Sequence, residues 1–198
     1  AAADFNGDGW LDLILADETR ITFGVLWVHN GSASGFGEGN VKFVYAPHDE
    51  EDTLSIEAIV TGDFDSDGSD ELMVAVAEND SDGDFWLEPS SAHLFYGSVT
   101  SATQSLIRLH FAPLPGSRSK ISSLSVTDDN EDGILDVACS IELLRQGFGS
   151  PAFKKSRLVQ LAGDGAGNFT ATQILEAPVR ASQILSVDLD GAAPSDIV

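Results

Sequence analysis

The sequence predicts an all-β chain made of repeated units of four short antiparallel strands. An acidic motif recurs about 60 residues apart along the 198-residue chain, a period that suits a four-stranded unit and is too long for most helical repeats. Short apolar runs of about four to eight residues, bounded by Gly, Pro, Asn and Asp, separate the motifs. No window keeps a 3.6-residue apolar period with helix caps over about ten residues, so we expect little helix.

The apolar runs occur in the same order in every unit and are rich in β-branched and aromatic residues, which favour strands. The run before each acidic motif is predicted to be the first strand of a unit, and the motif is the turn to the second strand. The predicted first strands are 55–60, 121–126 and 182–187. The second strands are 11–16, 71–77 and 135–141, the third 25–28, 93–96 and 157–161, and the fourth 41–45, 106–111 and 172–175.

Three acidic motifs, at 4–12, 63–71 and 128–136, follow the pattern Asp-x-Asp/Asn-x-Asp-Gly-x-x-Asp/Glu. Oxygen-bearing side chains at positions 1, 3 and 5 of a tight loop can converge on one centre, and the Gly at position 6 allows the positive φ that folds the loop. Position 9 closes the shell with a carboxylate. All these ligands are hard oxygens, without His or Cys, so the predicted cofactor is Ca²⁺ rather than zinc or copper.

The side chains predicted to bind calcium differ slightly between the three motifs. They are Asp4, Asn6, Asp8 and Asp12; Asp63, Asp65, Asp67 and Glu71; and Asp128, Asn130, Asp132 and Asp136. Asp70 stands beside Glu71 as a possible substitute at position 9. An EF-hand is excluded because strands, not helices, flank each motif and position 9 rather than position 12 closes the loop.

Two further interpretations of the acidic motifs bear on how many sites form. Asp, Asn and Gly also build Asx turns without a metal, which is the alternative to calcium binding. Three motifs in register argue against it, because their carboxylates would repel one another without a counter-ion. A fourth motif keeps Asp188, Asp190 and Asp196 but has Ala192 and Ala193 at positions 5 and 6, so weak or absent metal binding is expected there.

Composition excludes several classes of function. Ten Lys and Arg stand against 32 Asp and Glu, which gives a net charge of −22, so a nucleic-acid partner is not expected. No apolar run approaches the ~18–20 residues of a membrane span, and membrane insertion is not expected either. The single Cys excludes an internal disulfide framework and a Cys-rich zinc site.

These residues resemble the FG-GAP/VCBS repeat family, the calcium-loop β-propellers that include the integrin α-subunit head. The resemblance rests on the three Asp loops, on the runs "LDLILA", "ELMVAVA" and "LDVACS" that follow them, and on the Gly-rich stretches "HNGSASGFGEG" and "GDGAGNFTATQIL". It implies that each unit is one propeller blade. It also implies that the backbone carbonyls of Trp10, Ser69 and Ile134 complete the calcium sites, with Glu71 in place of the usual Asp.

The repeat divides the 198 residues into parts of a propeller. We expect strands two to four of one blade in 1–52, whole blades in 53–116 and 117–178, and the first strand and loop of another in 179–198. Because propellers close with about four to eight blades, the chain is predicted to be a partial propeller. Its remaining partners would be further blades in cis or a self-association partner.

The functional hypothesis is a calcium-stabilised, non-catalytic module that binds protein or glycan as an adhesion scaffold. A secreted or cell-surface location is expected, because loops of this kind are saturated by extracellular calcium and not by cytosolic calcium. The alternative is the propeller portion of a lyase or hydrolase acting on polysaccharides or lipid anchors. No catalytic residue can be nominated in this sequence, so that alternative places them outside it.

Overall fold

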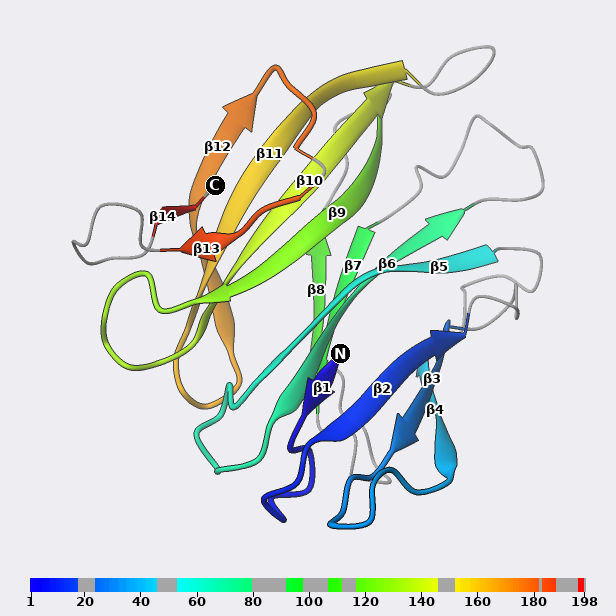
Figure 1. Cartoon of the computed structure of the whole chain (residues 1–198). Coiled ribbons are helices and arrows are strands. Elements are labelled where there is room, and N and C mark those ends of the chain that lie inside the picture. Colours follow the sequence, from blue (N-terminus) through cyan, green and yellow to red (C-terminus); the bar gives the residue numbers. More distant parts are fainter. Residues whose placement is uncertain are drawn as a thin grey trace.

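The structure is a computed structural model. It describes residues 1–17, 24–45, 53–79, 92–97, 107–111, 117–145, 152–181, 183–187 and 196–197. Within these residues the chain forms strands and turns without helices, as three four-stranded antiparallel sheets and one two-stranded sheet. The three larger sheets follow one another in chain order, each beside the next (Figure 1), and the described strands do not close into a ring. The predicted all-β class with four-stranded units is confirmed.

Each large sheet is a meander in which strands next to one another in sequence are also paired. Sheet 1 contains β1 (Ala2–Ala3), β2 (Asp12–Asp17), β3 (Gly24–His29) and β4 (Gly39–Tyr45). Sheet 2 contains β5 (Thr53–Gly62), β6 (Glu71–Asn79), β7 (Ala92–Gly97) and β8 (Ile107–Phe111). Sheet 3 contains β9 (Ser117–Thr127), β10 (Asp136–Arg145), β11 (Ala152–Gly163) and β12 (Phe169–Ala177). The remaining pair is β13 (Ser186–Val187) with β14 (Asp196–Ile197).

The acidic motifs join the first strand to the second in all three large sheets, as predicted. We call these segments loop 1 (4–12), loop 2 (63–71) and loop 3 (128–136). One expectation for the first unit is wrong. It was predicted to begin with its second strand, but Ala2–Ala3 pairs with Leu13 and Asp12 as a short first strand. Two small residues carry no apolar period, so no local pattern indicated this strand.

Strand β6 shows why the apolar runs do not alternate with polar residues. Its residues 72–76 are all buried, because sheet 2 has a neighbouring sheet on each face. Met73 and Ala75 face the core shared with sheet 3, whereas Leu72, Val74 and Val76 face the core shared with sheet 1. A strand covered on both faces needs apolar side chains at consecutive positions.

The core between sheets 2 and 3 is the larger of the two. It includes Phe64 from loop 2 and Cys139 from β10, and Phe169 packs against it from the start of β12. The Cys139 side chain is fully buried, and burial raises the pKa of its thiol to about 12. Cys139 therefore packs as a small apolar residue of this core.

The other face of sheet 3 is polar, and the segment after β12 covers it. We call this segment the strap (179–181 and 183–187). The hydroxyl groups of Ser122 and Ser140 both donate to the carbonyl of Ala181, at 2.8 and 2.6 Å. Three further serine hydroxyls accept strap N–H groups: Ser156 from Ala181, Ser123 from Ile184 and Ser125 from Ser186, at 2.9, 3.1 and 3.1 Å.

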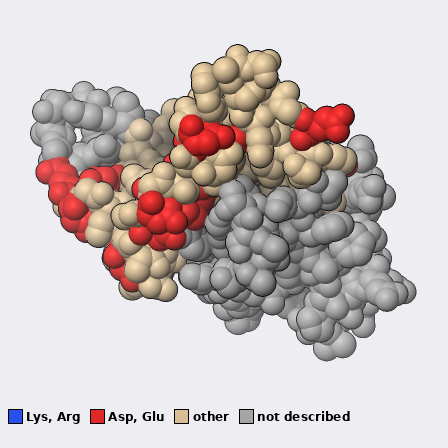
Figure 2. Space-filling view, turned by 90° about the horizontal axis from the view of Figure 1, so that it is seen from below, with Lys and Arg blue, Asp and Glu red and all other residues tan. Residues whose placement is uncertain are grey.

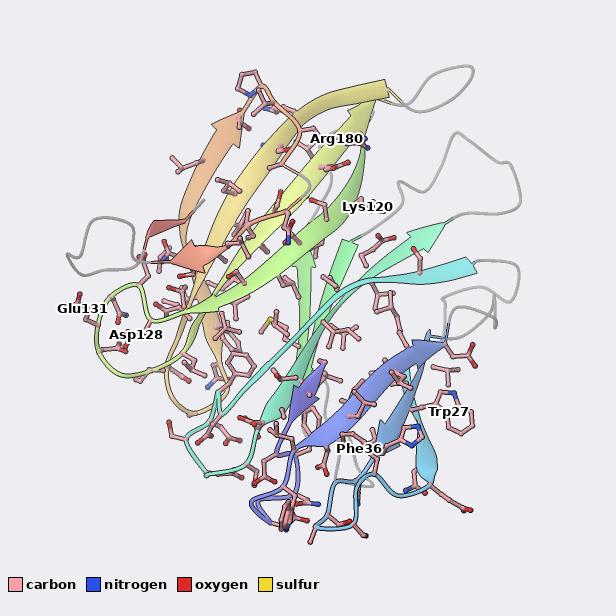
Figure 3. The ribbon with its side chains drawn as sticks, viewed as in Figure 1. Trp27, Phe36, Lys120, Asp128, Glu131 and Arg180 are labelled. Carbon is pink, nitrogen blue, oxygen red and sulfur yellow. The ribbon has the colours of Figure 1, made fainter. Side chains whose placement is uncertain are left out.

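An ion pair holds the start of the strap. The Arg180 guanidinium donates to both carboxylate oxygens of Glu142, at 3.0 and 2.9 Å, and the Glu142 carboxylate is nearly buried. Figure 3 shows Arg180 beside the upper part of β10. The strap ends with β13, which lies within the predicted first strand 182–187. Asp188 and Asp190 of the fourth acidic motif lie outside the described residues. No helix in the described part of the chain is long and apolar enough to cross a membrane.

Candidate metal centres

Loops 1, 2 and 3 adopt the same left-handed backbone conformation at two positions. Position 6 is glycine in each loop, with φ of 85° at Gly9, 91° at Gly68 and 80° at Gly133. The sequence predicted this positive φ. Position 4 is also left-handed, as Gly7 in loop 1 and as non-glycine residues in the other two loops, Ser66 and Glu131. Short polar side chains tolerate this conformation better than most residues do, but Glu131 is an uncommon residue there.

The side chains at positions 1 and 3 turn inward and accept backbone N–H groups of their own loop. The position 1 carboxylate accepts the N–H of position 6: Asp4 from Gly9 at 2.7 Å, Asp63 from Gly68 at 3.1 Å and Asp128 from Gly133 at 3.0 Å. The Oδ1 atoms of Asn6, Asp65 and Asn130, at position 3, accept the N–H of position 5 at 2.9, 3.2 and 3.0 Å. The sequence therefore brings the predicted ligands at positions 1 and 3 round one loop centre.

The position 5 carboxylates are exposed and face position 7. Asp8, Asp67 and Asp132 accept the N–H of Trp10, Ser69 and Ile134 at 2.9, 2.8 and 2.8 Å. These hydrogen bonds hold the backbone directly before the three carbonyls that the family resemblance nominated as ligands. Figure 3 shows Asp128 and Glu131 in the exposed loop between β9 and β10. Figure 2, which looks at the molecule from below, shows the acidic side chains as several separate patches on this side.

At position 9, Asp12 and Asp136 each bind the backbone of two segments, the acidic loop itself and a residue at or after the end of the third strand. Each is only 1% exposed, and each accepts two backbone N–H groups. Asp12 receives Phe5 at 3.2 Å and Gly31 at 2.7 Å, and Asp136 receives Asp129 at 3.1 Å and Gly163 at 2.9 Å. Gly31 follows β3 and Gly163 is the last residue of β11, so each carboxylate joins its acidic loop to the end of the third strand of its sheet. The sequence did not reveal these donors, because the pairing of two strands creates the contact.

Glu71 at position 9 of loop 2 behaves differently. Its Oε2 accepts the N–H of Phe64 at 2.9 Å, as the shorter Asp does in the other loops. Its longer side chain also brings a carboxylate oxygen within 4.8 Å of oxygens on both Asp63 and Asp65. No other group of three His, Cys, Asp or Glu side chains meets that distance in the residues that the structure describes. Burial and, secondly, the charge of Asp65 raise the pKa of Glu71 to about 7.

Loop 3 has an unsatisfied acceptor. In loops 1 and 2 the Oδ1 atom of the position 1 aspartate accepts the N–H of position 5, at 3.1 Å for Asp4 and 3.0 Å for Asp63. The corresponding Oδ1 of Asp128 is buried and has no hydrogen-bond partner. A buried carboxylate oxygen without a donor is costly unless a cation meets it. The donor set of loop 3 therefore fits a hard cation.

Asp70 does not act as a substitute for Glu71. Its carboxylate turns away from loop 2 and accepts the N–H of Asp4 in loop 1, at 2.9 Å. The sequence could not show this contact, because it joins residues 66 positions apart.

The three stacked meanders, each with an acidic loop between its first and second strands, define a β-propeller-like repeat module. A family model described as an FG-GAP-like repeat matches residues 4–74, which include loop 1, β2 to β5, loop 2 and the start of β6. This match confirms the resemblance to the FG-GAP repeat family. A sequence search of curated proteins finds no match to the chain.

Proposed function

We propose that this β-propeller-like module binds calcium through loops 1–3 and serves as an extracellular binding or adhesion scaffold for a protein or glycan. The observation that carries the calcium proposal is the convergence of Asp63, Asp65 and Glu71, whose carboxylate oxygens lie within 4.8 Å of one another. Three carboxylates so close together repel one another, and a divalent cation removes that repulsion. The unpartnered Oδ1 of Asp128 supports the same conclusion for loop 3.

The chemistry of the ligands favours calcium over other metals. The side chains at positions 1, 3, 5 and 9 offer carboxylate and amide oxygens only, and Ca²⁺ takes six to eight such ligands in flexible geometry. The same positions hold the backbone of each loop through the hydrogen bonds described above. A bound ion would therefore stabilise the loop that joins the first two strands of a sheet, and through it the edge of each sheet. The extracellular location is supported by calcium supply alone, since sites of this kind need more calcium than cytosol provides.

Calcium titration of the chelated protein by calorimetry tests the metal proposal. We expect about three sites, and Asp8→Ala, Asp67→Ala and Asp132→Ala should each remove one of them. Calcium at about a hundred times its dissociation constant should stabilise the fold by about 2.7 kcal/mol per linked site, seen as a higher melting temperature.

Asp164→Ala is the matched control for these variants. Asp164 is an exposed aspartate in a glycine-rich turn, and its carboxylate is satisfied by Ala166 and Asn168 of the same turn, at 2.8 to 3.0 Å. It should leave the number of calcium sites unchanged. A melting temperature that does not respond to chelation would show that the loops are Asx turns.

The scaffold part of the proposal needs a separate measurement. Trp10 in loop 1 is 49% exposed and Phe36 in the β3–β4 turn is 59% exposed, so they offer apolar contacts next to a proposed calcium loop. We expect glycan arrays and immobilised surface proteins to retain the calcium-loaded protein, and Trp10→Ser to weaken that retention. Equal retention with calcium and with chelator would separate ligand binding from the metal.

A further inference from the structure

Loops 1 and 2 are joined by two hydrogen bonds, one from backbone to side chain and one from backbone to backbone. The N–H of Asp4 donates to the Asp70 carboxylate at 2.9 Å, and the N–H of Asp70 donates to the carbonyl of Asp4 at 2.9 Å. Asp4 is the first residue of loop 1 and its side chain is a position 1 ligand. Asp70 precedes Glu71, the closing carboxylate of loop 2. The connection therefore begins at a proposed ligand of loop 1 and ends on the residue next to a proposed ligand of loop 2.

The two loops also approach each other at a second place. A methyl group at Gly7 of loop 1 would lie 3.2 Å from the Ser69 hydroxyl of loop 2. Loop 1 has its left-handed position 4 here, so the residue with the least side chain sits where the loops meet. Ser69 is position 7 of loop 2, next to Asp70. The two loops are therefore in contact at two places, so a change in the conformation of one loop alters contacts of the other.

Position 8 is polar in loop 2 alone. The corresponding residues are Leu11 in loop 1, which is 63% exposed, and Leu135 in loop 3. Leu135 also reaches the preceding sheet, where its Cδ1 fills the space beside Gly62, but this contact is apolar. Loops 2 and 3 therefore provide a comparison in which position 8 makes an apolar contact with the preceding sheet instead of accepting a hydrogen bond.

We propose that Asp70 couples the calcium sites of loops 1 and 2, so that calcium in either loop raises the affinity of the other, while loop 3 binds independently. This inference rests on the proposed calcium binding. An ion in loop 2 fixes Glu71 and with it the Asp70 peptide, which then holds the Asp4 peptide in place for loop 1. Because coupling between sites is reciprocal, loop 1 must favour loop 2 by the same factor. The Asp70 carboxylate also offsets the repulsion between two neighbouring cations.

The test disables one site and measures another. In the full chain, Asp8→Ala should weaken calcium binding at loop 2 by about fivefold or more, and Asp67→Ala should weaken loop 1 by the same factor. Asp132→Ala, which disables loop 3, should change neither. Calorimetric titration gives the affinities, and the single variants identify which step belongs to which loop. Unchanged loop 2 affinity in Asp8→Ala would overturn the coupling, whereas absence of any calcium binding in the unaltered chain would overturn the proposed function instead.

Two variants of Asp70 assign the coupling to that residue. Asp70→Leu introduces the residue that loops 1 and 3 have at position 8 and removes the carboxylate that accepts the Asp4 N–H. It should abolish the effect of Asp8→Ala on calcium binding at loop 2. Asp70→Asn keeps an acceptor oxygen without the charge, so it should retain most of the coupling. Persistence of the full coupling in Asp70→Leu would overturn the role of Asp70.

Amide hydrogen exchange gives a readout that needs no substitution at Asp70. In the Asp8→Ala variant, calcium can fill loop 2 but not loop 1. We expect the Asp4 amide, which donates to Asp70, to exchange several-fold more slowly when calcium is added. The Gly133 amide of loop 3, measured in the corresponding Asp132→Ala variant, should show no such protection. Equal behaviour of the two amides would contradict the proposed route.

Discussion

Phe64→Ala is expected to lower the free energy of unfolding by about 3–5 kcal/mol, the range for removing a large aromatic side chain from a core. The Phe64 ring is 1% exposed and lies in the core between sheets 2 and 3. It meets the Phe169 ring edge to face, with centroids 5.6 Å apart and planes at 73°. The substitution therefore loses a contact between two sheets as well as buried area.

Chemical denaturation measures this loss, and two comparisons sharpen it. Phe64→Leu fills most of the space and should cost clearly less, and Leu175→Ala, at a side chain that is 52% exposed, should change stability by less than about 0.5 kcal/mol. The Phe64 N–H that donates to Glu71 belongs to the backbone, so calcium should still bind loop 2 wherever the variant is folded. A loss below about 1 kcal/mol would show that the sheets do not depend on this ring.

Gly163→Ala is expected to destabilise the protein by about 2–4 kcal/mol, through overpacking and a broken buried hydrogen bond. A methyl group there would lie 2.4 Å from the Leu135 carbonyl oxygen, which is backbone and cannot rotate away. Relief of the clash moves the end of β11 away from loop 3. The N–H of Gly163 then leaves Asp136, a carboxylate that is 1% exposed and loses one of its two donors.

Gly133→Ala separates this effect from ordinary backbone strain. Gly133 has a φ of 80°, and a methyl group there would meet nothing within 4 Å. Its expected loss is the cost of a left-handed residue, about 1–2 kcal/mol. Urea unfolding of the two variants should therefore rank Gly163→Ala as the less stable. The reverse order would show that the junction of loop 3 with β11 adapts without strain.

The sequence predicted the repeat and the strands well because their signals are local. Strand β6 begins at Glu71 in both the prediction and the structure, and glycine at position 6 of each loop has the predicted positive φ. The convergence of positions 1 and 3 also follows from spacing alone. The missed first strand, Ala2–Ala3, has no pattern of its own and depends on pairing with β2.

The parts of the site that escaped prediction depend on contacts between segments far apart in the chain. Asp70 was nominated as a ligand beside Glu71, but the neighbouring sheet brings the Asp4 N–H within reach of its carboxylate. Gly31 and Gly163 were seen only as members of glycine-rich turns. Strand pairing places them against Asp12 and Asp136, where the approach of another backbone leaves no room for a side chain. Motif spacing holds no information about such neighbours.

The strap has a mechanical consequence. A β-strand in a sheet resists force through a row of bonds loaded together, but the strap is attached at separate points. Tension applied beyond Ser186 would first break the hydrogen bond of Ser186 to Ser125, and then the hydrogen bond of Ile184 to Ser123. The three hydrogen bonds at Ala181 would break next. The paired hydrogen bonds of Arg180 to Glu142 would break last. The first two steps break one hydrogen bond each and the later steps break several, so the strap would lengthen by unpeeling while sheet 3 stays intact. In single-molecule extension, release of this segment would give a short extension at low force before any sheet unfolds.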